Sequence, residues 1–308
     1  MAYYHVLLNP FAGHNGIEEV KKNLLSILDG NNLTFTDVTA LKEENDLQNL
    51  VSALEPETKL VIAGGDGTLN RFVNAVDCDN IANEIYLFAA GSGNDFYADL
   101  KAHADEYFPE SEKSAIGENS LLKINKFIRN LPQVTVNGKS YKFINGIGYG
   151  IDGYCCEVGD KLKAAGKKVN YTSIAIKGLL FHFKPRAAKV WVDGKEYEFK
   201  KVWIAPTMNG RCYGGGMIPT PNQNRAAKDK LSLCVMYGKG KLKTLMAFPK
   251  IFTGEHVKKE KMVKILEGKS ITVKFAKPCA LQIDGETILN VSEYSCTLAE
   301  AAEKALAA

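Results

Sequence analysis

The chain has 308 residues, of which 45% are hydrophobic and 24% are charged, and its formal net charge is +4. This length is too great for one ordinary hydrophobic core and suits two domains. The composition is ordinary for a globular protein. The mild positive charge permits an anionic surface or substrate but gives no support to nucleic-acid binding.

Cysteines and the N-terminal stretch indicate the compartment. The seven cysteines form no CxxC pair and no cluster with histidine, which argues against zinc and favours free thiols in a reducing compartment. The first residues lack the basic region and apolar core of a signal peptide. No window approaches the ~18 apolar residues of a membrane-spanning helix. We therefore expect a cytoplasmic protein whose contact with a membrane is peripheral.

Strands and helices alternate in the N-terminal part of the chain. Apolar patterns predict strands at 3–8, 33–38, 59–63 and 85–89, with helices near 16–28, at 43–54 and after residue 68. This alternation predicts right-handed βαβ units around a parallel sheet, an α/β domain with flanking helices. Ligands of such sheets bind beyond the carboxyl ends of the strands. Asn9-Pro10, Gly64–Thr68 and Gly91-Ser92 fall at these ends.

The stretch Gly64-Gly65-Asp66-Gly67-Thr68 is the most informative. A buried strand stops at three glycines around one aspartate, and an amphipathic helix follows. Backbone N–H groups and the positive helix end converge there, which is typical of a phosphate site, and Asp66 indicates a metal on those phosphates. No Gly-Lys-Ser/Thr follows, so the stretch is not a P-loop. A plain strand-to-helix turn is the alternative.

A second junction of the same kind is Gly91-Ser92-Gly93-Asn94-Asp95-Phe96. Asn94 and Asp95 are good first-turn residues, so simple helix capping is the alternative. Both junctions place an aspartate at the same edge of one sheet. We therefore interpret them as one site.

Short strands and hairpin turns dominate the rest of the chain. Asn137-Gly138 and Asp193-Gly194 predict hairpins, and helices are expected near 155–164, 170–182 and 241–252. The spacing predicts a β-rich, sandwich-like second domain. Strands are expected at 123–128, 133–136, 141–144, 190–192, 196–199, 201–206, 231–237, 262–266, 271–275, 279–283 and 287–291. We expect the domains to span 1–122 and 123–294, with the Ala-rich tail 295–308 returning to the first.

The motifs in order resemble the catalytic domain of bacterial diacylglycerol kinases and related soluble lipid kinases. Gly-Gly-Asp-Gly-Thr alone is also similar to the phosphate loop of NAD kinases and phosphofructokinases. In the second half, Asn145–Asp152, Gly214–Pro219 and Leu281–Glu286 resemble further segments of the lipid kinase family. The resemblance runs from about residue 5 to about residue 290.

This resemblance implies an ATP-dependent lipid kinase with its site in the cleft between the domains. A diacylglycerol-like alcohol would accept the phosphoryl group, with Mg²⁺ as cofactor and a place in phospholipid biosynthesis. It implies nucleotide contacts at Asn9, Gly64, Gly65, Asp66, Gly67, Thr68, Asn70, Gly91 and Ser92. It implies a metal network of Asp66, Asp95 and Asn125, and a structural cation held by Asp229 with the carbonyls of Ala226 and Leu231.

The resemblance also implies which residues would act on the lipid that accepts the phosphoryl group. Asp284 is the candidate general base, with Glu286 beside it, although Asp-Gly is also a common hairpin turn. His14 and Lys177 would contact a lipid or phosphate group.

Three positions depart from the family pattern. Asn125 stands where the family has an acid, which removes a charge from the metal network. His14 and Ala98 stand where the family often has basic residues that meet phosphate. These departures leave the headgroup preference open.

Lysines 239, 241, 243, 250, 258, 259, 261 and 264 crowd one region and alternate with apolar residues such as Leu242 and Phe252. One interpretation is a solvated basic face. The other is an amphipathic segment that rests on the anionic inner surface of a membrane. Whether the chain forms a homodimer stays open.

Two other functions remain as alternatives. The first is a kinase of a soluble metabolite, of the NAD kinase class, which shares only the first motif. The second is a non-catalytic protein that binds nucleotide or lipid on the same fold. Phosphorylation of lipid micelles, compared with phosphorylation of NAD, would distinguish them.

Overall fold

The computed structural model describes residues 1–11, 16–43, 45–91, 93–113, 116 and 120–299. The chain divides into two compact units, Met1–Asn130 and Leu131–Ala308, and each is described by itself. The division follows a short helix at the end of the first unit.

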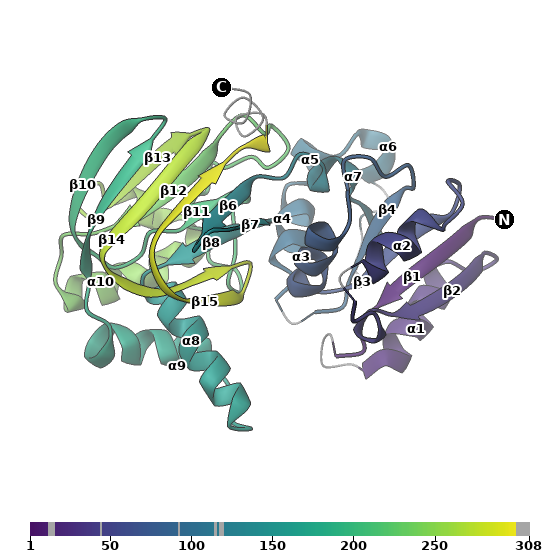
Figure 1. Cartoon of the computed structure of the whole chain (residues 1–308), viewed down its shortest axis with the longest axis horizontal. Coiled ribbons are helices and arrows are strands. Elements are labelled where there is room, and N and C mark those ends of the chain that lie inside the picture. The colour runs from purple at the N-terminus through teal and green to yellow at the C-terminus, as the bar shows by residue number, and fades with distance from the viewer. Residues whose placement is uncertain (12–15, 44, 92, 114–115, 117–119, 300–308) are drawn as a thin grey trace. The chain divides into compact units, whose positions relative to one another are not determined.

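The first unit is an α/β domain (Figure 1, purple to blue). Its elements in chain order are β1 (Tyr3–Leu8), α1 (Gly16–Ile27), β2 (Asn32–Asp37), the 3₁₀ turn Val38–Ala40, α2 (Asp46–Ser52), β3 (Lys59–Gly64), α3 (Asp66–Ala75), β4 (Ile85–Ala89), α4 (Asp95–Ala102), α5 (Ala104–Tyr107), α6 (Glu110–Lys113), β5 (Leu122–Lys123) and α7 (Asn125–Ile128).

The sheet of the first unit has the strand order β2-β1-β3-β4-β5. The first four strands are parallel, and only β5 is antiparallel to its neighbour β4. The central strand β3 is buried from Leu60 to Gly64, and helix α1 packs Val20 and Leu24 against the sheet. The predicted parallel sheet with flanking helices is confirmed, because apolar strands of this kind need cover on both faces.

One expected strand of this region is wrong. Residues 123–128 were expected to be extended, but the strand β5 ends at Lys123 and α7 follows at once. The apolar residues Ile124, Phe127 and Ile128 recur at helical spacing, and a single helical turn buries all three. Short apolar runs do not separate strand from helix by periodicity alone.

The second unit is β-rich (Figure 1, teal to yellow). Its elements are β6 (Gln133–Val136), β7 (Lys139–Lys142), β8 (Gly146–Tyr149), α8 (Ile151–Ala164), α9 (Tyr171–Lys177), the π-helical segment Gly178–His182, β9 (Arg186–Val192), β10 (Lys195–Val202), β11 (Thr207–Met208), β12 (Leu231–Met236), α10 (Lys241–Ala247), the 3₁₀ segments Phe248–Thr253 and Glu255–Lys258, β13 (Val263–Gly268), β14 (Ser270–Ile283) and β15 (Glu286–Thr297).

Ten antiparallel strands form the sandwich-like body of this unit. The order is β13-β12-β11-β8-β14-β15-β6-β7, and β9 joins β14 to β10. Where two short strands were expected, at 271–275 and 279–283, the chain forms the single long strand β14. Its first half pairs with β9 and its second half with β8, with a register shift between Lys274 and Cys279. This bend lets one strand serve both parts of the sheet around a shared apolar core.

The hairpin turns follow the sequence closely. Asn137-Gly138, Asp193-Gly194 and Asp284-Gly285 all have positive φ at both residues, as type I′ turns require. The two predicted hairpins, β6–β7 and β9–β10, are therefore confirmed. The third turn joins β14 to β15 and carries the candidate base Asp284.

The start of the tail stays with the second unit. Residues 295–297 are the end of β15, which pairs with β6 and β14, and Leu298 is buried in the sandwich core. The rest of the tail that was expected to return to the first domain, residues 300–308, lies outside the described residues.

Candidate active site

Three strand ends meet at one edge of the first sheet. Asn9 follows β1, and its side-chain amide donates to Thr68 Oγ1 in the first turn of α3 at 2.8 Å. Its backbone N–H donates to Ala63 of β3 at 3.1 Å. Thr68 is buried, and its Oγ1 accepts this hydrogen bond from Asn9. The sequence motifs at 9 and at 64–68 therefore form one structure.

The two glycine turns touch each other through their backbones. A Cβ on Gly91 would lie 2.4 Å from Gly65 Cα, and a Cβ on Gly65 would lie 2.9 Å from Gly91 Cα. Real Cβ atoms do not approach other atoms so closely, so both positions require glycine. Asn94, at φ 52°, closes the second turn with hydrogen bonds to the backbone N–H and C=O of Gly91.

The carboxylate of Asp66 connects the two strand–glycine–helix junctions through hydrogen bonds. Its carboxylate accepts hydrogen bonds from the backbone N–H groups of Asp95 at 2.8 Å and Phe96 at 2.9 Å, which are the first residues of α4. The carboxylate thus satisfies N–H groups at the start of the helix and lies at its positive end. Asp66 begins α3 as well, so the N-termini of both helices lie beside one carboxylate.

Two carboxylates border the glycine at the centre of the second turn. A Cβ on Gly93 would lie 3.6 Å from Asp66 Oδ2 and 3.9 Å from Asp95 Oδ2. Mg²⁺ binds through one or two carboxylates, keeps several waters and takes the remaining ligands from phosphate. This pair fits such a partly hydrated ion and not a full protein cage. Among the described residues, no group of three or more His, Cys, Asp or Glu side chains forms a cage for a metal.

Asn125 lies elsewhere. Its side chain accepts from the backbone N–H of Ile85 at 2.8 Å and donates to the carbonyl of Asn83 at 2.9 Å. Ile85 begins β4, whereas the glycine turn follows the end of β4 at Ala89. Four residue steps along the strand separate these ends by about 13 Å. The structure therefore does not bring Asn125 to Asp66 and Asp95, and we leave it out of the proposed metal site.

Four further residues were expected to contact the nucleotide, the lipid or a phosphate group. Ser92 and His14 lie outside the described residues. Asn70 lies on α3, where its carbonyl and side-chain oxygen accept from Asn74. Lys177 is exposed at the end of α9, in the second unit.

The candidate base Asp284 is held by the backbone of its own unit. Its carboxylate accepts from the N–H groups of Ile144 at 2.6 Å and of Asn145 and Gly146 at 2.9 Å each. These bonds fix the orientation of the carboxylate at the entry to β8. Glu286 is exposed at the start of β15, two residues further on.

Asp193, in the equivalent turn of another hairpin, has a similar environment. Its carboxylate accepts from the N–H groups of Lys269 and Ser270. Hydrogen bonding to neighbouring backbone is thus common to the two Asp-Gly turns. It does not by itself separate a catalytic aspartate from a structural one.

The loop expected to hold a structural cation contains one exposed acid. Asp229 is exposed, Ala226 is half-buried and Leu231 is buried. In the same loop, Arg225 is almost fully buried and donates to the carbonyl of Ile144 and the side chain of Asn145. The guanidinium therefore connects this loop to the backbone that binds Asp284.

Sequence reasoning missed one buried ionisable pair. Asp152, in the first turn of α8, accepts a hydrogen bond of 2.5 Å from the hydroxyl of Tyr213. Burial raises the pKa of Asp152 to about 7, and the hydrogen bond from Tyr213 opposes that rise. A charged residue at the end of the apolar, glycine-rich run 145–151 was the available signal.

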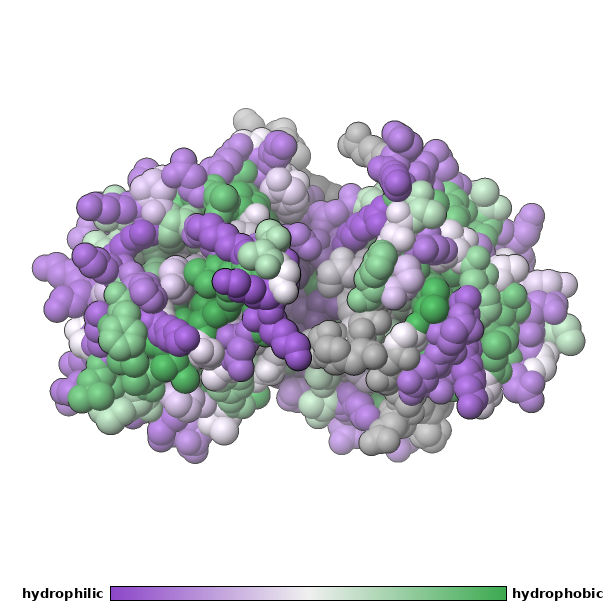
Figure 2. All heavy atoms as spheres, turned by 90° about the horizontal axis from the view of Figure 1, so that it is seen from below, coloured by the Kyte–Doolittle hydropathy of each residue, from purple (hydrophilic) through white to green (hydrophobic). Residues whose placement is uncertain are grey.

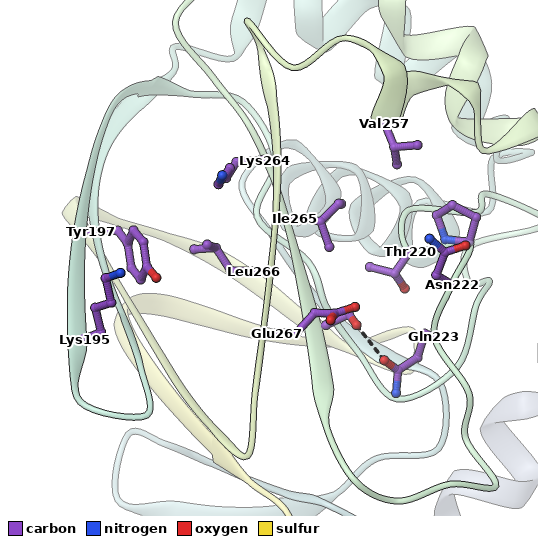
Figure 3. A pocket seen from close by; sticks show the side chains of 12 residues that line it. Lys195, Tyr197, Thr220, Asn222, Gln223, Val257, Lys264, Ile265, Leu266 and Glu267 are labelled. Carbon is purple, nitrogen blue, oxygen red and sulfur yellow. Dashed lines mark hydrogen bonds between the residues drawn. The ribbon is translucent and has the colours of Figure 1, made fainter.

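A surface pocket of about 620 Å³ lies elsewhere in the second unit, and Figure 3 shows its lining. Lys195 and Tyr197 of β10 border it, with Lys264–Glu267 of β13 and the loop residues Thr220 and Gln223. It shares no residue with the candidate site. Its mixed lining of lysines, glutamate and aliphatic side chains indicates no particular ligand.

Together, the glycine turns, the two helix N-termini and the paired aspartates lie in an α/β domain, which a β-sandwich-like domain follows in the chain. Comparison with known proteins finds a family model for each of these two domains. Residues 3–124 match the model of the diacylglycerol kinase catalytic domain, and residues 145–301 match the YegS C-terminal NAD kinase beta sandwich-like domain. The chain belongs to this diacylglycerol kinase and lipid kinase family, and the family supports a kinase function with ATP as co-substrate.

Individual relatives span nearly the whole chain. "Putative lipid kinase YtlR" of Bacillus subtilis is 25% identical over 304 residues, 93% of this chain and 94% of that protein. "Diacylglycerol kinase" of Mycobacterium tuberculosis H37Rv is 21% identical over 297 residues, 95% of this chain and 89% of that protein. The crystal structure of "a putative diacylglycerol kinase from Bacillus anthracis str. Sterne" has 18% identity and a TM-score of 0.62, covering 96% of this chain and 94% of that one, and shares the fold.

Within the described ranges, no helix combines the length and the apolar character needed to cross a bilayer.

Proposed function

We propose that the protein transfers the γ-phosphoryl group of ATP to the hydroxyl of a diacylglycerol-like lipid. The observation that carries the proposal is the direct contact between the two glycine turns, with Asp66 bound to the start of α4. This arrangement concentrates backbone N–H groups, two helix N-termini and two carboxylates at one sheet edge. Phosphoryl transfer depends on such positioning and charge stabilisation.

The first unit would bind the nucleotide. Glycines 64, 65, 67 and 91 let the triphosphate approach the backbone, and the helix N-termini of α3 and α4 favour its negative charge. Thr68 would donate its hydroxyl proton to a phosphate oxygen, since Asn9 already occupies one of its lone pairs. Asp66 and Asp95 would hold Mg²⁺ through bound water, and the ion would offset charge on the phosphates.

The second unit would supply the base. Asp284 would take the proton of the lipid hydroxyl while the hydroxyl oxygen bonds to the γ-phosphorus. The bond from that phosphorus to the bridging oxygen then breaks, and ADP leaves. Backbone N–H groups of Ile144 and Asn145 would hold the Asp284 carboxylate in a fixed orientation for this step. Because the nucleotide groups and the base belong to different units, we propose that the two units enclose the substrates between them.

Radiolabelled ATP, presented with diacylglycerol in detergent micelles and separately with NAD, tests the proposal. Labelled lipid phosphate, identified by mass spectrometry, is the expected product. Label on NAD alone would favour the soluble-metabolite kinase. Binding of Mg·ATP without turnover of any lipid would favour the non-catalytic alternative.

A further inference from the structure

The second unit has a helical layer with two different faces. It consists of α9, the π-helical segment Gly178–His182, α10 and the 3₁₀ segment Phe248–Thr253, and we call it the helical layer. Its inner side chains, which include Ile174, Leu179, Ala247 and Ile251, are buried in an apolar core. The layer also has six large apolar side chains that are exposed: Tyr171, Ile176, Phe181, Leu242, Met246 and Phe252.

The most exposed of these side chains come from two segments far apart in the sequence. Phe181 is 71% exposed, Leu242 68% and Met246 61%. The segments are joined directly, because Lys241 Nζ donates to the carbonyl of Leu180 at 2.6 Å. Packing of the π-helical segment against α10 thus makes one surface from residues some sixty positions apart. π-helical turns are rare and often lie at functional sites.

Charge on the helical layer is of one sign only. Residues 171–184 and 237–254 contain no aspartate and no glutamate. Their exposed lysines are 177, 184, 241, 243 and 250, and of these Lys250 forms an ion pair with Glu255, just beyond the layer, at 3.7 Å. Figure 2 views the molecule from below, the side on which α8, α9 and α10 lie in Figure 1, and shows green apolar side chains gathered on the second unit with purple hydrophilic ones around them. A merely solvated basic face would not need Phe181, Leu242 and Met246 in water.

We propose that the outer face of the helical layer docks on a bilayer that contains anionic lipids. Phe181, Leu242 and Met246 would enter the boundary between headgroups and acyl chains, and the lysines would meet lipid phosphates. The occupant is a membrane and not a second protein, because apolar tips among lysines 177, 184, 241 and 243, with no acid in the layer itself, complement an anionic surface. The inference extends the proposed function, since a lipid kinase needs access to lipid, but it rests on its own observations.

Sedimentation with sucrose-loaded vesicles tests the docking without any chemistry. The vesicles contain phosphatidylcholine alone or 70:30 phosphatidylcholine and phosphatidylglycerol, and the triple variant Phe181→Ser/Leu242→Ser/Met246→Ser is compared with wild type. We expect the variant to lose about tenfold or more in partitioning to the anionic vesicles. Leu289→Ser, at an apolar residue of β15 that is 55% exposed, is the control and should bind as wild type.

Two double charge-reversal variants test whether the lysines of the helical layer contribute to binding. Lys184→Glu/Lys243→Glu should weaken anionic-vesicle binding about tenfold or more, because each lysine near such a surface contributes about fivefold. Lys139→Glu/Lys195→Glu has the same change in net charge on the β6–β7 and β9–β10 hairpins. It should lose less binding. Equal losses in the two pairs would overturn the docking site, because only overall charge would then matter.

Other results also overturn or separate the claims. The docking proposal would be overturned if the wild-type protein did not bind anionic vesicles. It would also be overturned if the triple serine variant bound them as the wild type does. A shift from dimer to monomer in the apolar variant, seen by light scattering without a loss of vesicle binding, would assign the face to a second copy instead. Phosphorylation of a short-chain, water-soluble diacylglycerol reports the kinase separately. Its absence together with intact vesicle binding would reject the proposed function and support the docking.

Discussion

The carboxylate of Asp66 accepts the backbone N–H of Asp95 at 2.8 Å, so one predicted metal ligand holds the start of the helix that carries the other. This bond gives Asp66 a structural role and a functional one at the same time. A variant at this position changes both, so affinity and stability have to be measured side by side.

Asp66→Asn should therefore weaken Mg·ATP binding and destabilise the fold. Loss of a charged contact of ~1.5–3 kcal/mol raises the ATP dissociation constant by about tenfold or more, and the weakened helix start costs about 0.5–2 kcal/mol. Calorimetric titration and thermal unfolding measure the two effects. Asp37→Asn, which removes the carboxylate that binds the Thr39 N–H in the same unit, should change stability only. Wild-type ATP affinity in Asp66→Asn would reject the metal role.

Gly67→Ala should change stability and ATP binding in opposite directions. Nothing lies within 4 Å of a Cβ at this helical position, so alanine should stabilise the protein, by ~0.5–1 kcal/mol. The same Cβ would stand where the triphosphate approaches the backbone, so ATP binding should weaken severalfold. Gly240→Ala, at an equally open position before α10, is the control and should leave ATP binding unchanged. An alanine at 67 that binds ATP normally would remove the phosphates from this turn.

Asp284→Asn tests whether Asp284 is the general base. Asp193→Asn, in the equivalent Asp-Gly turn of another hairpin, is the control. In Asp284→Asn the amide group would face a backbone N–H, so this variant should lose stability, by ~1–3 kcal/mol. Asp193 is exposed and one of its oxygens accepts both N–H bonds, so Asp193→Asn should lose less. Only Asp284→Asn should also lower turnover, by ~10²–10⁴-fold. Rates are compared at a temperature well below both unfolding midpoints. If the two variants lose activity alike, Asp284 is a structural turn residue.

Asp152 predicts a pH dependence of stability. Its folded pKa of about 7 exceeds the ordinary value of 3.8, so between these values the folded state keeps a proton that the unfolded chain releases. Asp152 therefore lowers the free energy of unfolding as pH rises, by up to ~1.4 kcal/mol per unit. Asp152→Asn removes this loss. Urea unfolding from pH 4.5 to 8 should show the variant gaining on wild type up to about pH 7.

The control for Asp152 is Asp160→Asn, an exposed position on the same helix. It should show no such gain with rising pH. A constant stability difference between Asp152→Asn and wild type over the whole range would mean that the carboxyl is ionised in the folded protein at acid pH.

Asn125→Asp distinguishes a metal ligand from a strand anchor. A carboxylate there would face the carbonyl of Asn83, which now accepts from the amide of Asn125. We expect a loss of ~1–3 kcal/mol in stability and no change in the Mg²⁺ concentration needed for activity. A lower Mg²⁺ requirement, measured in a metal titration, would return position 125 to the active-site network.

Local sequence determined the two strand–glycine–helix junctions and the Asn-Gly and Asp-Gly hairpins. Strand and helix periods, and the need for glycine at positive φ, are properties of neighbouring residues, so one sequence is enough to predict them. Residues 124–128 were an exception, because the short spacing of Ile124, Phe127 and Ile128 suits either a strand or a helical turn.

Only the tertiary structure decided which polar groups meet. It placed the amide of Asn125 at the far end of β4, brought the hydroxyl of Tyr213 to Asp152 across sixty-one positions, and packed Leu180 against Lys241. These contacts depend on which segments the sheet order and helix packing bring together. The chemistry of a side chain determines which groups it can bind. The groups that bury it, or that shift its pKa, come from distant parts of the chain.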